Sequence, residues 1–282
     1  MKICISAEST IDLPKELLEE FDIKTVPFTV LLGEKNELDG VITPDEIFAY
    51  VEETKILPKT SAVNEFQFKE HFKNCLKDYD AVIHFSLSSE ISCAFQNAEI
   101  VAKKFENVYV IDSRSLSTGI ALLAIYARKL ANKGLAPEEI VARCESRIPS
   151  VQASFVINTL EYLHKGGRCS GLAKFAAALF RIKPQIIVED GKMIPGKKYH
   201  GKIAPIVEEY CRDTLDEFNS PDLSIAFVTH TQADDAMRAE AYKALKNRGF
   251  KKIYDTTAGA TISSHCGPKT LGILYINDGL KE

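Results

Sequence analysis

Short apolar runs alternate with amphipathic helical patterns through the first half of this chain, and the alternation restricts the fold more than any other feature. Strand-like runs at 2–6 and 81–86 are separated by helical patterns at 44–54 and 64–76. Helices between successive strands are typical of parallel βαβ units. We therefore predict that residues 1–150 form a three-layer α/β/α domain with a parallel sheet.

The pattern changes in the second half of the chain, where strand-like runs become more frequent. Runs at 151–157 and 271–278 enclose two long helical patterns, at 202–218 and 232–248. A chain of 282 residues is also long for a single core. These features predict a second, smaller α/β domain with a mixed sheet over residues 151–282.

The composition argues against several functions. Lys and Arg number 35 against 39 Asp and Glu, a net charge of −4, so no basic surface for a nucleic-acid backbone is expected. The seven cysteines are scattered without a CxxC motif, which is typical of buried thiols in a reducing cytoplasm. No charge-free apolar run reaches the roughly 18 residues that span a bilayer. We predict a cytoplasmic protein with no nucleic-acid partner and no stable membrane insertion.

Metal and nucleotide motifs have little support. None of the six histidines pairs with another at HxH or HExxH spacing, so no metal site is predicted. The segment GKMIPGKK (191–198) is close to a phosphate loop but ends in Lys198, where Mg²⁺ binding needs a hydroxyl. We predict a β-turn with exposed lysines there. The nucleophile motif GxSxG is absent, although a serine paired with a distant histidine stays open.

Hydroxyl side chains are crowded after the strand at 81–86. Ser88 and Ser89 are good N-caps for a helix predicted over 89–105, and capping needs only one of them. Ser92 would fall in the first helical turn, where free N–H groups and the helix dipole attract an anion. The cluster is therefore either a helix cap or an anion site.

A second hydroxyl pair, Thr60 and Ser61, precedes the helix that Asn64 is expected to cap. If both clusters leave strands of one parallel sheet, they converge at its carboxyl edge, where ligands usually bind. Such a site suits one carboxylate or phosphate group. The segment 262–272 is predicted as a polar turn in which His265 either hydrogen-bonds in a cleft or has no ligand.

The segment 172–182 is predicted to be an apolar helix. Periodicity alone favours a core helix, but its small residues also allow it to line a tube for an apolar ligand. The tunnel-lining candidates on this helix are Phe175, Ala177, Leu179 and Phe180.

Taken in order, these motifs resemble the DegV family of bacterial fatty-acid-binding proteins. The resemblance covers nearly the whole chain and rests on ESTIDLP, KTS at 59–61, SSEISCAFQNA at 88–98, VYVIDS, LEYLHKGGRCSG, IKP and SHCGPKTLG. It implies a non-catalytic two-domain α/β protein that encloses one long-chain fatty acid, such as palmitate or stearate, between its domains. The fatty acid is then the only ligand, with no cofactor.

The resemblance also implies a set of binding residues. Thr60 and Ser92 correspond to the direct carboxylate ligands, while Ser61 and His265 support them, and Ser89 belongs to the same serine motif. In some members the protein presents the acyl group to a separate fatty acid kinase, which makes acyl phosphate.

The chain departs from the family pattern at several positions. Cys93 and Ala94 replace a glycine and a threonine, Lys269 replaces a glycine, and His200 stands where an arginine that bears on the kinase role is common. Two other classes of function stay open. One is a serine esterase or acyltransferase that uses Ser92 and His265, and the other is a sugar- or phosphate-binding domain.

Overall fold

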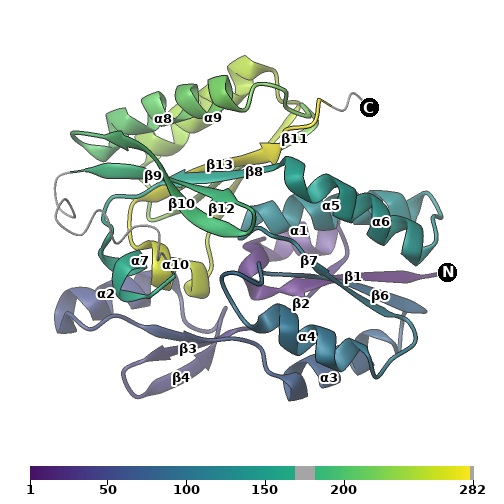
Figure 1. Cartoon of the computed structure of the whole chain (residues 1–282). Coiled ribbons are helices and arrows are strands. Elements are labelled where there is room, and N and C mark those ends of the chain that lie inside the picture. Colours follow the sequence, from purple (N-terminus) through teal and green to yellow (C-terminus); the bar gives the residue numbers. More distant parts are fainter. Residues whose placement is uncertain (169–181, 280–282) are drawn as a thin grey trace.

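The computed structural model describes residues 1–168 and 182–279 (Figure 1). Its first sheet has the order β2-β1-β6-β7, and every neighbouring pair is parallel, which confirms the predicted βαβ arrangement. The strands of this sheet are β1 (Ile3–Glu8), β2 (Ile23–Val26), β6 (Ala81–Ser86) and β7 (Val108–Asp112).

The second sheet is mixed, as predicted, with the order β10-β9-β8-β13-β11-β12. Of its described pairs, β11–β12 is parallel and the others are antiparallel. Helices α8 (Ile203–Glu217) and α9 (Asp235–Arg248) cover its outer face (Figure 1). Its strands are β8 (Val151–Val156), β9 (Lys183–Glu189), β10 (Lys192–Tyr199), β11 (Ile225–Thr231), β12 (Lys252–Thr257) and β13 (Thr270–Ile276).

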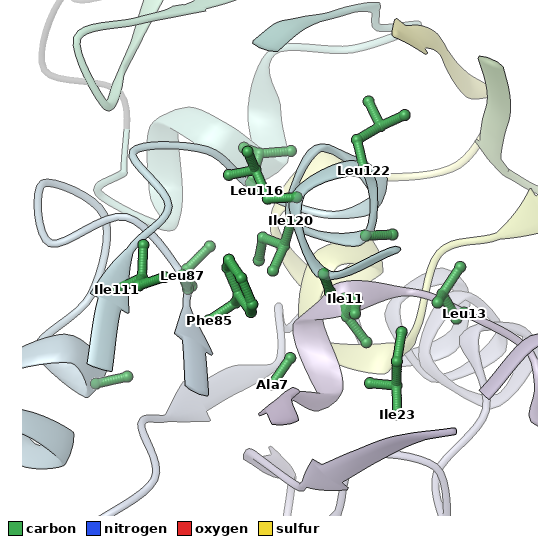
Figure 2. Packing of buried hydrophobic residues seen from close by; sticks show 14 of the residues in the cluster. Ala7, Ile11, Leu13, Ile23, Phe85, Leu87, Ile111, Leu116, Ile120 and Leu122 are labelled. Atoms are coloured by element: carbon green, nitrogen blue, oxygen red, sulfur yellow. The ribbon is translucent and has the colours of Figure 1, made fainter. Parts of the chain in front are cut away.

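Helix α5 (Thr118–Asn132) lies between the two sheets and joins their cores (Figure 1). It contacts β1 and β6 of the parallel sheet and β8, β11 and β13 of the mixed sheet. Ile120 of α5 packs with Phe85 of β6, as Figure 2 shows, and the same apolar cluster includes Phe155 and Leu274. Apolar burial is therefore continuous from one sheet to the other.

Short-range capping signals predict two helices correctly. Helix α2 (Pro44–Thr54) begins after Thr43, and α3 (Glu65–Cys75) begins after Asn64, each with a complete capping box. Both boxes use a side chain three residues further along the chain, so the signal is local. The other elements of the first half are η1 (Ser9–Ile11), α1 (Lys15–Glu20), α4 (Ala94–Ala102), α6 (Pro137–Arg147) and η2 (Ile148–Ser150).

A small antiparallel sheet, in the order β4-β3-β5, was not predicted. It consists of β3 (Thr29–Leu32), β4 (Lys35–Leu38) and β5 (Lys59–Ser61). Thr60 and Ser61 lie in β5, so the prediction that both hydroxyl clusters leave strands of one parallel sheet is wrong. The two hydroxyl clusters still line one cavity. The small sheet itself packs with α2, α7 (Glu161–Lys165) and α10 (Ala260–Cys266) through a shared set of buried apolar residues.

The predicted helix over 89–105 starts later, at Ala94, so Ser88 and Ser89 do not cap it. The Ser88 hydroxyl instead donates to the carbonyl of Gly191 at 2.7 Å, and the backbone N–H of Ser89 donates to Asp112 at 3.2 Å. Tertiary partners therefore hold residues 87–93 as a loop.

Two further segments differ from prediction. Residues 192–199 form strand β10, and the turn is confined to Asp190 and Gly191, both with positive φ. The expected polar turn around His265 is helix α10, whose first N–H groups donate to Asp12 and Asp39. Within residues 1–168 and 182–279, no helix is both long and apolar enough to cross a bilayer.

Candidate functional site

A cavity of about 520 Å³ opens where β5, the 87–93 loop, α7 and α10 meet. Its wall contains all five predicted ligand residues, namely Thr60, Ser61, Ser89, Ser92 and His265. The volume falls within the range of pockets that bind small molecules. The structure thus gathers residues that are up to 205 positions apart in the chain.

A hydrogen bond links the two sides of the cavity wall. The Nε2 atom of His265 lies 2.8 Å from Oγ1 of Thr60. Burial, and secondarily the positive charge of Arg168, lower the pKa of His265 to about 4. The imidazole is therefore neutral near pH 7, and only one of its nitrogens carries a proton.

The environment of the other ring nitrogen selects the tautomer. The Nδ1 atom of His265 is buried without a hydrogen-bond partner among the described residues. It faces Gly166, where an added Cβ would lie only 2.6 Å from Nδ1. A proton on Nε2 avoids a buried N–H without an acceptor, which would carry a full desolvation cost. His265 then donates to Thr60, whose hydroxyl hydrogen is free to bind an anion.

The two serines have hydroxyl hydrogens available in the same way. Oγ of Ser92 accepts from the backbone N–H of Ala94 at 3.2 Å, and Oγ of Ser89 accepts from Arg114 at 3.4 Å. Each oxygen is already an acceptor, so each O–H is left as a donor. With Thr60, these groups form a set of neutral donors suited to one anionic group.

The rest of the wall is largely apolar. It includes the side chains of Phe28, Leu87, Leu116, Leu163, Met193 and Ile262. A small apolar pocket of about 30 Å³ shares Leu116, Ile262 and Cys266 with this cavity and reaches Phe155 and Leu274 of the mixed sheet. The site therefore combines hydroxyl donors with an apolar surface that continues toward the core.

Two charged residues of the wall were not among the predicted ligands. Arg168 lies just after Gly167, whose φ of 70° turns the chain, and its Nη1 donates to the carbonyl of Gly166 at 2.7 Å. The Gly-Gly-Arg segment at 166–168 was the sequence feature from which Arg168 could have been predicted. Glu90 also lines the cavity, and Arg114 and Lys192 neutralise its charge at 3.4 Å and 3.6 Å.

The tunnel-lining residues predicted from the sequence are not part of the described wall. The tunnel candidates Phe175, Ala177, Leu179 and Phe180 lie outside the described residues. In the part of the chain that the structure describes, no group of three or more His, Cys, Asp or Glu side chains is arranged to hold a metal ion.

Comparison with known proteins gives relatives along the whole chain. A protein of Thermotoga maritima named a fatty acid-binding protein is 28% identical over 284 residues, which cover 96% of both chains. A DegV domain-containing protein of Clostridium acetobutylicum is 30% identical over 280 residues, 98% of both chains.

Solved structures agree with these relatives. The structure of a DegV family protein from Thermus thermophilus, described for its fatty acid binding, matches with a TM-score of 0.91 at 28% identity and covers 98% of this chain and all of its own. A stearic acid-binding protein from Eubacterium ventriosum matches with a TM-score of 0.84 at 27% identity, over 98% of both chains. The profile of the DegV family, described as uncharacterised proteins, matches residues 2–278. The chain belongs to the DegV family.

Proposed function

We propose that this protein binds one long-chain fatty acid without chemically changing it. The observation that carries the proposal is the Thr60–His265 hydrogen bond on the wall of a cavity that also contains Ser92 and much apolar surface. Relatives described as binding fatty acids, over nearly their whole length, support the same ligand class.

The chemistry of the wall suits such a ligand. Burial of an acyl chain contributes about 0.8 kcal/mol per CH₂ group, so the tail supplies most of the affinity. The carboxylate must be hydrogen-bonded when it leaves water. In this proposal Thr60 and Ser92 donate to the carboxylate, and His265 orients the Thr60 hydroxyl, with Ser61 and Ser89 beside them.

An esterase or acyltransferase has less support. A catalytic serine needs a histidine as its base and a further group to orient that histidine. His265 bonds to Thr60 rather than to Ser92, and its Nδ1 has no partner in the described parts of the chain. These contacts favour ligand binding over nucleophilic catalysis.

We also propose that residues 1–150 and 151–282 form the two domains that flank the cavity. Its wall takes Thr60 and Ser92 from the first and Leu163 and His265 from the second. Delivery of the bound acid to a fatty acid kinase stays a prediction that rests on the family resemblance. His200, the departure that bears on it, is exposed after β10 and available to test.

Native mass spectrometry of protein purified without added lipid tests the main proposal. We expect about one fatty acid per chain. After delipidation, a long-chain acid should rebind saturably, and its methyl ester should bind much more weakly because the ester lacks the anionic group. Equal affinity for acid and ester would remove the assigned carboxylate site. Turnover of an ester substrate that is lost in Ser92→Ala would establish the enzyme instead.

A further inference from the structure

Two cysteines lie together on the far side of the parallel sheet from α5. Cys4 is in β1 and fully buried, and Cys75 ends α3 with 7% of its surface exposed. On β1, Cys4 shares a face with Ser6, and on α3, Cys75 shares a face with His71. The 2.6 Å contact between Ser6 and His71 therefore places the two thiols side by side. The proposed fatty-acid site uses neither thiol, and no cysteine motif in the sequence brings these two residues together.

A polar network next to the pair fixes a donor toward Cys75. The Nε2 atom of His71 lies 3.7 Å from the Cys75 sulfur and 2.6 Å from the Ser6 hydroxyl. Ser6 in turn lies 3.0 Å from Nδ1 of His84, whose Nε2 is 3.2 Å from the carboxylate of Glu8.

The direction of these hydrogen bonds follows from Glu8. Its carboxylate accepts from the Ser86 hydroxyl and the Leu87 N–H, so it is an acceptor for His84 as well. With Nε2 of His84 donating, its Nδ1 accepts from Ser6, and Ser6 accepts from His71. The Nε2 of His71 therefore carries a proton, which also faces the sulfur of Cys75.

This arrangement makes the two thiols unequal. The neighbouring Cys4 thiol, with a further contribution from His71, lowers the pKa of Cys75. The Cys75 side chain, together with burial, raises the pKa of Cys4. A thiolate is the nucleophile in thiol oxidation, and a second thiol in contact with it can resolve the first product.

We propose that Cys4 and Cys75 form a redox pair, which hydrogen peroxide converts into an intramolecular disulfide. The Cys75 thiolate attacks one peroxide oxygen, the O–O bond breaks, and hydroxide leaves, so that Cys75 becomes a sulfenic acid. The Cys4 sulfur then attacks the Cys75 sulfur, the S–O bond breaks, and the departing hydroxide takes the Cys4 proton as water. Overall, two thiols lose two electrons and two protons, and peroxide is reduced to two waters.

The test is peptide mapping of the full-length protein after graded hydrogen peroxide. Free thiols are blocked with N-ethylmaleimide, and the digest is analysed by mass spectrometry with and without dithiothreitol. We expect a cross-linked peptide pair containing Cys4 and Cys75, which the reductant separates. Exposed Cys93 reports that peroxide has reached the protein. This measurement needs no variant to fold.

Variants separate the two roles. Cys4→Ser should leave Cys75 as a sulfenic acid that dimedone traps, and Cys75→Ser should abolish the cross-link and leave Cys4 unmodified. The matched control is Cys144→Ser, which should leave the cross-link unchanged, since Cys144 is buried in α6 and burial raises its pKa to about 12. The proposal is overturned if Cys4 and Cys75 are both still alkylated after Cys93 is oxidised. It is equally overturned if wild-type Cys75 proceeds to sulfinic acid while Cys4 stays a free thiol.

Discussion

The imidazole of His265 lies 2.8 Å from the hydroxyl of Thr60, which is 205 residues earlier in the chain. The bond joins α10 to the small sheet that contains β5 and crosses the wall of the cavity. In the favoured tautomer His265 donates to Thr60. This hydrogen bond both holds α10 against β5 and orients the Thr60 hydroxyl. In the proposed function, carboxylate binding therefore depends on the position of α10.

The first prediction concerns Thr60. Thr60→Val keeps the shape of the side chain and removes its donor, so it should weaken fatty-acid binding by about 1.5–3 kcal/mol, the scale of a hydrogen bond to a charged group. Thr60→Ser, which keeps the hydroxyl, is the matched control and should bind nearly normally. Titration with acid and methyl ester measures both. A similar loss for the ester would show that Thr60 contacts the tail rather than the carboxylate.

Ser92 should act with Thr60 on one ligand group. Ser92→Ala should leave the unfolding free energy of the lipid-free protein nearly unchanged, because within the described residues its hydroxyl oxygen accepts one hydrogen bond, from the N–H of Ala94 at 3.2 Å. It should weaken acid binding by about 1.5–3 kcal/mol. The Thr60→Val/Ser92→Ala double variant should be non-additive, since both residues contact one carboxylate. Strictly additive losses would place the two hydroxyls on separate groups.

The low pKa of His265 makes stability depend on pH. In the folded protein the ring protonates near pH 4, whereas an ordinary histidine protonates near 6.5, so between these values the unfolded chain binds more protons. Stability is therefore complete above about pH 6.5 and falls as the pH drops toward 4, by up to about 3 kcal/mol.

Denaturant unfolding between pH 4 and 7 measures this effect. His265→Gln should flatten the profile within that window, whereas the control His164→Gln should not, because His164 is exposed on α7. An unchanged slope in the His265 variant would mean that other groups cause the acid sensitivity.

The turn between β9 and β10 provides a test of the loop that contains Ser89 and Ser92. Gly191 has a φ of 78°, and an added Cβ would lie 2.5 Å from Oγ of Ser88. Gly191→Ala should lower stability by more than Gly134→Ala, by about 1–3 kcal/mol for the clash. Gly134 has a similar φ of 82° with no atom near the added Cβ, so it controls for backbone strain. Equal melting temperatures for the two variants would show that the turn accommodates the added methyl group without loss of stability.

Ion pairs from Arg147 to Asp222 and Asp278 should stabilise the packing of α6 against the segments that flank the mixed sheet. Arg147 lies 2.6 Å from both Asp222 and Asp278, with 10% of its side chain exposed. Arg147→Met should cost about 3–5 kcal/mol of unfolding free energy, because it removes the guanidinium charge that compensates the carboxylates of Asp222 and Asp278. Arg143→Met on the same helix removes an exposed pair with Glu139 and should cost less than about 1 kcal/mol. Chemical denaturation compares the two, and equal costs would contradict the role of Arg147.

Local signals were sufficient for much of the fold. The caps of α2 and α3 use side chains within three residues of each other, so their starts could be predicted from the sequence. The alternation of strands and helices likewise predicted the parallel sheet, because each βαβ unit is formed by one continuous stretch of the chain. The resemblance of the motifs to the DegV family identified five residues of the cavity wall, although not Arg168 or Glu90.

Long-range hydrogen bonds decided what local signals could not. Ser88 and Ser89 are residue types that favour helix caps. Ser88 is instead hydrogen-bonded to Gly191 and Ser89 to Asp112, and α4 starts at Ala94. Helix α10 has no side-chain cap of its own, so its sequence alone resembled a turn.

The sequence by itself determined which residues carry hydroxyls, imidazole and apolar surface, together with the helices and strands that local patterns specify. The tertiary structure alone decided that Thr60 meets His265 and that the ring is neutral. The physical reason is that Asp12 and Asp39, more than 200 residues away, accept the first N–H groups of α10 and so orient the helix that bears His265. Burial, which depends on the whole fold, then lowers the pKa of that histidine.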